Sequence, residues 1–174
     1  MAITISGSGI TSANIADGTI TTDDIASGVT GKVLQVVQAI DSSSSLGNNT
    51  SPVSVMTASI TPSSTSSKVL CMVSAPVYGW DNNNLTYTWR VYNRLYRGTT
   101  SGTSLFTGNT YNSQTDGASH ISINYLDSPS TTSSQTYTFA LWVADTPEYW
   151  AFPSNANTTP PQADATIILM EIAG

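Results

Sequence analysis

The feature that most constrains the fold is a succession of short runs with alternating apolar side chains, separated by clusters of Ser, Thr, Asn, Gly and Pro. In Ser119–Leu126, Ile121, Ile123 and Tyr125 alternate with polar residues. Side chains of a strand point alternately to its two faces, so this period of two predicts a strand with one buried face. The clusters between the runs predict turns. The repeated pattern is typical of an all-β sandwich or barrel.

Seven strands are predicted, with a weaker eighth candidate at Ser104–Thr107. They are Lys32–Ile40, Val53–Ile60, Lys68–Ala75, Leu85–Arg97, Ser119–Leu126, Thr136–Ala144 and Ala165–Ile172. The longer breaks, which carry the turn residues, are Asp41–Pro52, Thr61–Ser67, Asp127–Gln135 and Asp145–Asp164.

Composition excludes several classes of protein. Ser and Thr make up 52 of 174 residues and charged residues only 9%, which suits strands and turns. With a net charge of −6 and five basic residues, the chain has no basic stripe for a nucleic acid. Its one cysteine, Cys71, forms no internal disulfide. The longest apolar runs are far below the roughly 18 residues of a membrane helix, so no membrane insertion is expected.

The first thirty-one residues differ from the rest, because isoleucine recurs every five positions at Ile10, Ile15, Ile20 and Ile25. A period of five places no continuous apolar stripe on an isolated helix or strand. We therefore expect an extended segment, 1–31, whose isoleucines pack against symmetry mates or a larger assembly, followed by a sandwich domain, 32–174. A flexible leader is the alternative interpretation.

Two predicted strands are apolar on both faces. They are the runs Val69–Val73 and Ile167–Met170. A two-layer sandwich standing alone leaves one face of such a strand in water, which favours a central position or a subunit interface. The predicted interface residues are Leu70, Met72, Ile168 and Met170. A short helix is the alternative for the second run.

The segment Gly9–Ile20 resembles the repeated Ile-x-x-x-x-Ile-x-Asp-Gly-x-Ile peptides in the tail-fibre stems of marine and cyanobacterial phages. The body resembles the compact domain that follows those stems, in Gly31–Val37, Ile60–Leu70, Tyr125–Pro129 and Ile167–Ile172. The resemblance implies an antiparallel jelly-roll-like β-sandwich that forms a homotrimer.

The function that this resemblance implies is that of a bacteriophage virion structural protein. It would be a trimeric tail-fibre-type protein on the virion surface, assembled in the host cytoplasm and anchored by its N-terminal segment to other virion proteins of the tail or capsid. The alternatives are a capsid-decorating or head-fibre protein and, with less support, a free lectin or a glycan hydrolase. The number of copies per particle distinguishes a tail fibre from a capsid-decorating protein.

No catalytic site, metal site or cofactor site is predicted, and the chain is expected not to be an enzyme. His120 is the one histidine and falls on the polar face of its strand. The acidic candidates for a sugar-cleaving pair stand mostly in turn-like settings, and nothing in the sequence holds two of them over a groove. They are Asp81, Asp116, Asp127, Asp145 and Glu148.

Two sets of aromatic residues are candidates for contact with a partner. Trp80, Asp81, Tyr149 and Trp150 place rings beside polar groups in predicted loops, where a host-surface glycan could stack; the alternative is that the rings cap the sandwich. Within Leu85–Arg97, alternation places Tyr87, Trp89, Val91 and Leu95 on the core face. The opposite face carries Arg90, Tyr92, Arg94 and Tyr96, and is either a contact surface or a solvated face with cation–π pairs.

Overall fold

The computed structural model describes residues 33–43, 45–81, 89–112, 116–146, 148–153 and 163–174, and the segment Val33–Gly174 is one compact unit. Its described residues form strands and no helix. The strands are β1 (Val33–Asp41), β2 (Ser45–Gly47), β3 (Val53–Ile60), β4 (Lys68–Asp81), β5 (Trp89–Arg97), β6 (Thr103–Asn112), β7 (Asp116–Asp127), β8 (Gln135–Val143), β9 (Glu148–Phe152) and β10 (Ala165–Ile172).

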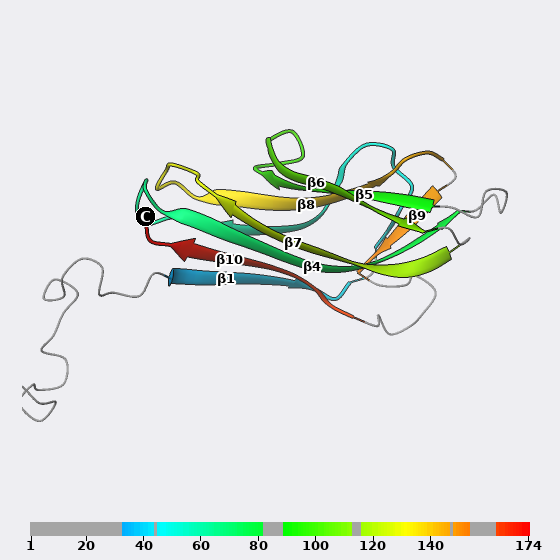
Figure 1. The fold of residues 1–174 in the computed structure, drawn as a ribbon, viewed down its shortest axis with the longest axis horizontal. Helices are drawn as coiled ribbons and strands as arrows, with labels where there is room; N and C mark the ends of the chain where they lie inside the picture. The colour runs from blue at the N-terminus through cyan, green and yellow to red at the C-terminus, as the bar shows by residue number, and fades with distance from the viewer. Residues whose placement is uncertain (1–32, 44, 82–88, 113–115, 147, 154–162) are drawn as a thin grey trace, which may run out of the picture. The chain divides into compact units, whose positions relative to one another are not determined.

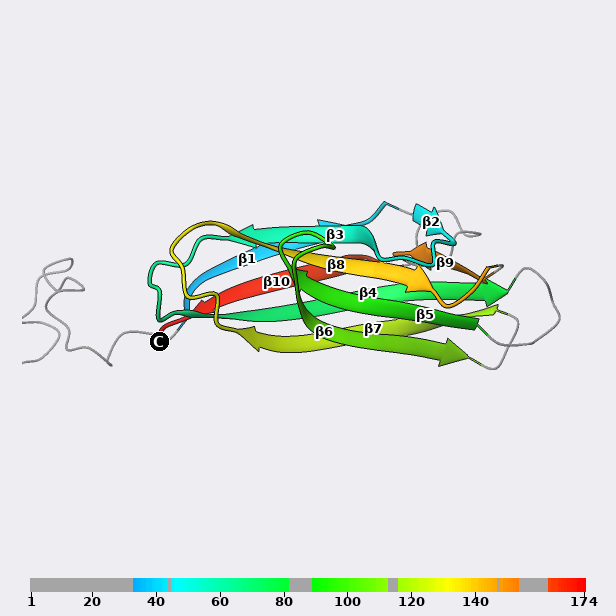
Figure 2. The same cartoon turned by 90° about the horizontal axis from the view of Figure 1, so that it is seen from above.

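The strands pack as two antiparallel sheets, one above the other (Figure 1). One sheet has the order β1-β10-β4-β7, and the other has the order β3-β8-β5-β6. These two four-stranded orders are those of a jelly roll, in which most neighbouring strands in a sheet, all here except β5 and β6, are not consecutive in the chain. The short strands β2 and β9 extend the first sheet at the end opposite the C-terminus (Figure 2). The predicted fold class, an antiparallel jelly-roll-like sandwich, is confirmed.

All seven predicted strands are present, and the weaker candidate at 104–107 lies in the first half of β6. The predictions for β3 and β10 match to the residue. Two short strands were missed: β2 and β9 lie inside segments predicted as turns, because runs of three and five residues next to Ser, Asn and Pro show no clear alternation. β4 continues to Asp81, which was predicted to begin a turn.

The core lies between the sheets, where the inward side chains of each strand meet. The alternation predicted for β5 and β7 is confirmed at Trp89, Val91, Leu95, Ile121 and Ile123, all of which are buried, and residues 82–88 lie outside the described part of the chain. Two glycines make room for large rings: a Cβ on Gly79 would stand 2.3 Å from the Trp89 ring, and one on Gly47 would stand 2.3 Å from the Trp150 ring.

A polar group ties the two sheets together beside this core. The Asp127 carboxylate, at the end of β7, accepts a hydrogen bond of 2.8 Å from the Tyr137 hydroxyl on β8. It also forms an ion pair of 2.9 Å with Arg97 on β5. Burial and the bond to Asp127 raise the pKa of Tyr137 well above its usual range. Asp127, predicted as a turn residue, is therefore a structural link between the sheets.

Candidate functional site

The four predicted interface residues lie side by side on the outer face of the β1-β10-β4-β7 sheet. Met170 on β10 pairs directly with Leu70 on β4, and Ile168 pairs with Met72. All four side chains are half-buried and point away from the core, because Val69, Cys71, Ile167 and Leu169 between them are buried. The prediction that both runs are apolar on two faces is therefore confirmed, whereas the subunit interface itself stays a prediction.

The register extends this surface across four strands. Val36 on β1 pairs with Met170, Met170 with Leu70, and Leu70 with Leu126 on β7. The two end residues are strongly exposed, Val36 at 57% and Leu126 at 50%. We call this surface the apolar face, which comprises Val36, Ile40, Leu70, Met72, Leu126, Ile168 and Met170.

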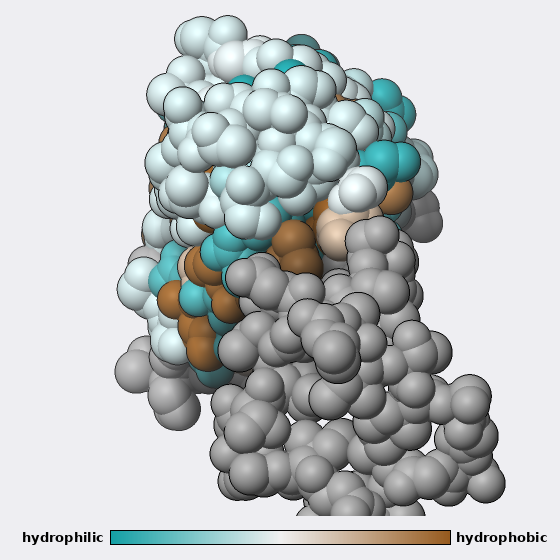
Figure 3. All heavy atoms as spheres, turned by 90° about the vertical axis from the view of Figure 1, so that its left-hand side faces the viewer, coloured by the Kyte–Doolittle hydropathy of each residue, from teal (hydrophilic) through white to brown (hydrophobic). Residues whose placement is uncertain are grey.

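The contrast with the rest of the surface is visible from the end of the sandwich (Figure 3). Apolar side chains lie on its lower part, where β1 and β10 lie in Figure 1, with hydrophilic ones among them, and the upper part is mostly pale, which marks weakly hydrophilic residues. Contiguous apolar patches on the surface of a soluble protein commonly mark interaction sites. The apolar face is therefore the strongest candidate for a contact surface in the described chain.

The aromatic candidates occupy the far end of the same sheet. Trp80 on β4 and Tyr149 on β9 pair across the strands, and their rings stack with centroids 5.2 Å apart. Trp150 is 2% exposed and packs against Gly47, and Asp81 is 9% exposed, so both belong to the interior. The structure thus separates the four residues predicted to contact a glycan: Trp150 caps the core, the alternative considered above, while Trp80 and Tyr149 lie half-buried on the outer face.

The outer face of the opposite sheet carries two arginines among aromatic rings. Arg90 lies over the Tyr92 and Tyr111 rings at 5.9 and 5.5 Å. Arg94 lies over the Tyr96 and Trp142 rings at 5.5 and 5.1 Å. The Tyr92 and Trp142 rings stack with centroids 5.3 Å apart. The predicted face is confirmed, although Tyr96 is only 3% exposed and two rings, Tyr111 and Trp142, come from neighbouring strands.

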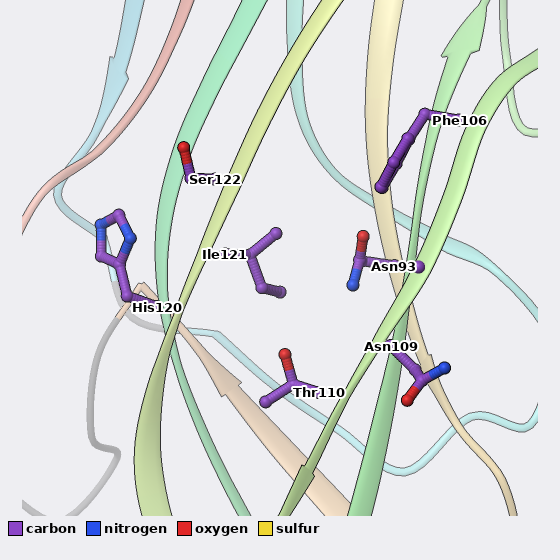
Figure 4. A pocket seen from close by; sticks show the side chains of 8 residues that line it. Asn93, Phe106, Asn109, Thr110, His120, Ile121 and Ser122 are labelled. Carbon is purple, nitrogen blue, oxygen red and sulfur yellow. The ribbon is translucent and has the colours of Figure 1, made fainter.

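A slot of about 190 Å³ opens between β6 and β7, the outermost strands of the two sheets on one side of the sandwich. Figure 4 shows Asn93, Thr110 and Ile121 directed into it, whereas His120 lies on the other side of β7. Asn93 is 3% exposed and stands on the core face of β5, and its Oδ1 has no hydrogen-bond partner among the described residues. Sequence reasoning missed Asn93, although a polar residue at a core position of an alternating strand was a readable signal.

Among the acidic candidates, Asp81 on β4 pairs with Glu148 on β9 and Asp116 on β7 stands opposite Trp80, whereas Asp127 lies at the other end of β4. The ring of His120 is exposed and lies 3.1 Å from the Ser74 hydroxyl. Glu148 accepts hydrogen bonds from the backbone N–H groups of Arg90 and Ala144, a structural role. In the described ranges, no group of three or more His, Cys, Asp or Glu side chains is placed to hold a metal ion. The described residues include no helix with the length and apolarity to cross a membrane.

The isoleucines predicted to attach the protein, Ile10, Ile15, Ile20 and Ile25, lie outside the described residues. The division into segment 1–31 and domain 32–174 likewise stays a prediction.

Comparison with known proteins gives little beyond the fold. No family model matches the sequence, and no curated protein matches it. Solved structures that align include the VP2 subviral particle of infectious bursal disease virus, at 10% identity and a TM-score of 0.40, and the Gx strain of that virus, at 11% and 0.39. Each alignment covers 80% of this chain and 37% of the other, so the chain spans well under half the length of those proteins. A likeness at this level transfers no property of VP2 to this chain.

Proposed function

We propose that this chain is a non-enzymatic structural protein of a bacteriophage particle, which assembles as a homotrimer through the apolar face. The observation that carries the proposal is the continuous pairing Val36–Met170–Leu70–Leu126 across four strands. Burying apolar surface contributes about 25 cal/mol per Å², so a second copy that covers these side chains stabilises the assembly.

Closed symmetry limits how many copies such a surface can bring together. Three copies around a threefold axis cover one another's apolar faces, and no face is left to add further copies. The opposite sheet, with its arginines and exposed polar residues, then faces outward. This arrangement agrees with the phage tail-fibre resemblance of the sequence, which implies a trimeric head domain.

The N-terminal segment supplies the attachment in this proposal. Its isoleucines, spaced by five residues, dock on another virion protein of the tail, and copy number adds strength to individually weak contacts. Trp80 and Tyr149, stacked on the outer face of the sheet, are the residues proposed to meet a host-surface glycan.

The experiment that tests this function compares phage particles carrying the full chain with particles carrying a chain that lacks residues 1–31. We expect the shortened protein to be lost from purified particles while it still folds and trimerises in solution. Quantitative mass spectrometry of full particles then gives the location: about a dozen copies support the tail, and hundreds support decoration of the capsid. Shortened protein retained at full copy number would show that the attachment role is wrong.

A further inference from the structure

A second group of cations and aromatic rings lies on the outer face of the β3-β8-β5-β6 sheet. Its two cations are Arg90 and Arg94, which both belong to β5. They are four residues apart, so their side chains point to the same side of the sheet. At about 3.3 Å per residue, the two positions are separated by about 13 Å along the strand. The stacked rings of Tyr92 and Trp142 lie between them, and Tyr111 on β6 lies beside Arg90. We call these five residues the arginine–aromatic face.

The guanidinium groups are held in place before any ligand arrives. Arg94 donates from Nε to the Thr107 hydroxyl at 2.8 Å and from one terminal nitrogen to the Tyr96 hydroxyl at 3.2 Å. Arg90 donates to the Tyr92 hydroxyl at 3.2 Å. A guanidinium has five N–H donors, so each group keeps donors for an anion. Arginines held in this way lose little side-chain freedom on binding, which favours affinity.

Charge distinguishes this face from the rest of the molecule. The protein has a net charge of −6 and five basic residues, and two of the five stand here. The ion pair found among the described residues joins Arg97 to Asp127, and the Glu148 carboxylate beside Arg90 accepts hydrogen bonds from backbone N–H groups. The two arginines are therefore placed to meet anions from outside the chain.

The geometry selects among anionic polymers. Nucleic acids present a phosphate at every nucleotide and are bound largely through the number of phosphates that are neutralised, of which two arginines on a chain with a net charge of −6 supply few. An extended acidic peptide binds a sheet mainly by adding a strand at an edge, but both edges of β5 are already paired, with β6 and β8. Sparse charge with aromatic rings between suits a polymer of sugar rings. Tyr92 and Trp142 each turn one ring face to the other, and the Tyr111 ring, which is 55% exposed, offers apolar surface for a sugar beside Arg90.

We propose that the arginine–aromatic face binds an acidic polysaccharide, with Arg90 and Arg94 each holding one anionic group and the rings of Trp142, Tyr92 and Tyr111 contacting the sugars between. The face lies on the sheet opposite the apolar face, so a trimer formed through the apolar face, as proposed above, does not use it. Polysaccharide binding at this face does not depend on trimer formation, so either proposal can be wrong while the other holds.

The test measures binding of the full chain to polygalacturonate, to the same polymer with its carboxylates methyl-esterified, and to oligothymidylate. We expect polygalacturonate to bind, and the dissociation constant to rise about tenfold or more on esterification. Arg90→Gln and Arg94→Gln each weaken binding by a similar factor. Lys68→Gln removes one exposed cation from the other sheet and leaves binding unchanged.

Two further variants separate this site from simple ion exchange. Trp142→Leu keeps both charges and is expected to weaken binding, because the stacking surface is lost. Arg94→Lys keeps the positive charge but lacks the planar guanidinium group, so we expect its affinity to lie between those of the unmodified chain and Arg94→Gln. This variant still tests the site if Arg94→Gln does not fold. The inference is overturned if the esterified polymer or oligothymidylate binds as tightly as polygalacturonate, if Trp142→Leu binds like the unmodified chain, or if Lys68→Gln loses as much as the arginine variants.

Discussion

Glu171 and Ser63, which are 108 positions apart in the chain, are joined by two hydrogen bonds. The backbone N–H and the hydroxyl of Ser63 both donate to Oε1 of Glu171 at 2.7 Å. The side-chain amide of Gln35 donates to the other oxygen at 2.6 Å and also to the Thr61 carbonyl at 2.7 Å. A fully buried carboxylate thus connects β10, β1 and the loop after β3, which fixes the end of the sheet that carries the apolar face.

The first prediction concerns the pH dependence of stability. Burial by itself raises the pKa of Glu171, but the hydrogen bonds from Gln35 and Ser63 outweigh it and lower the pKa to about 2, from 4.5 in the unfolded chain. The contribution of Glu171 is therefore complete above pH about 4.5 and is lost as the pH falls toward about 2. Urea unfolding of the wild type and Glu171→Gln checks this.

We expect Glu171→Gln to be less stable than the wild type at pH 7 by about 1–3 kcal/mol. The glutamine side chain places an N–H donor where the Glu171 carboxylate accepts hydrogen bonds from Ser63 and Gln35. The difference in free energy of unfolding between the two proteins shrinks as the pH falls through this window. A difference that is the same at pH 7 and at pH 2 would contradict the assignment.

The second prediction concerns Cys71, the one thiol. Burial in the core, with a smaller effect from Asp127, raises the pKa of Cys71 to about 12, so little thiolate exists near neutral pH. We expect no reaction with Ellman's reagent at pH 8 in the native protein, and one thiol per chain in guanidinium chloride. Fast labelling without denaturant would show that Cys71 is not buried in the core between the sheets.

The third prediction concerns Asn93, whose amide lacks a partner at Oδ1 inside the core face of β5. An unpaired buried polar group is unfavourable, so Asn93→Leu, which has a similar shape, is expected to stabilise the protein by about 1–2 kcal/mol. The midpoint of thermal unfolding measures the change. A loss of stability would instead show that the slot between β6 and β7 holds ordered water or a ligand that the amide binds.

Sequence patterns predicted most of the fold because alternation directly reports a half-buried strand. β3 and β10 were placed to the residue, whereas β2 was missed because three residues cannot show a period. The sequence also indicated that Leu70 and Met170 point outward. Their direct pairing depends on the strand order of the sheet, which brings residues 100 positions apart together and which no local pattern contains.

For the candidate contact residues as well, the sequence predicted the side chains along one strand but not the contacts between strands. The run from Arg90 to Tyr96 predicted a face with cations and rings, but the ring that completes it, Trp142, comes from β8 through the sheet register. Trp150 was read as a loop residue because its strand, β9, is short, and the glycine that accommodates its ring is about a hundred positions earlier. Contacts between residues that are far apart in the chain could therefore not be predicted from the sequence.

The most direct test of the proposed assembly is the mass of the full chain by sedimentation equilibrium, with two matched variants. Leu126→Ser changes a leucine of the apolar face that is 50% exposed, and Leu46→Ser changes one outside it, on β2, that is 59% exposed. Three chains of 18.3 kDa give about 55 kDa, the mass expected for the unmodified protein and for Leu46→Ser. Leu126→Ser is expected to shift toward the monomer mass while its circular dichroism stays unchanged. An unmodified chain that sediments as a monomer, or a Leu126→Ser variant that stays as trimeric as Leu46→Ser, would contradict the proposed role of the apolar face.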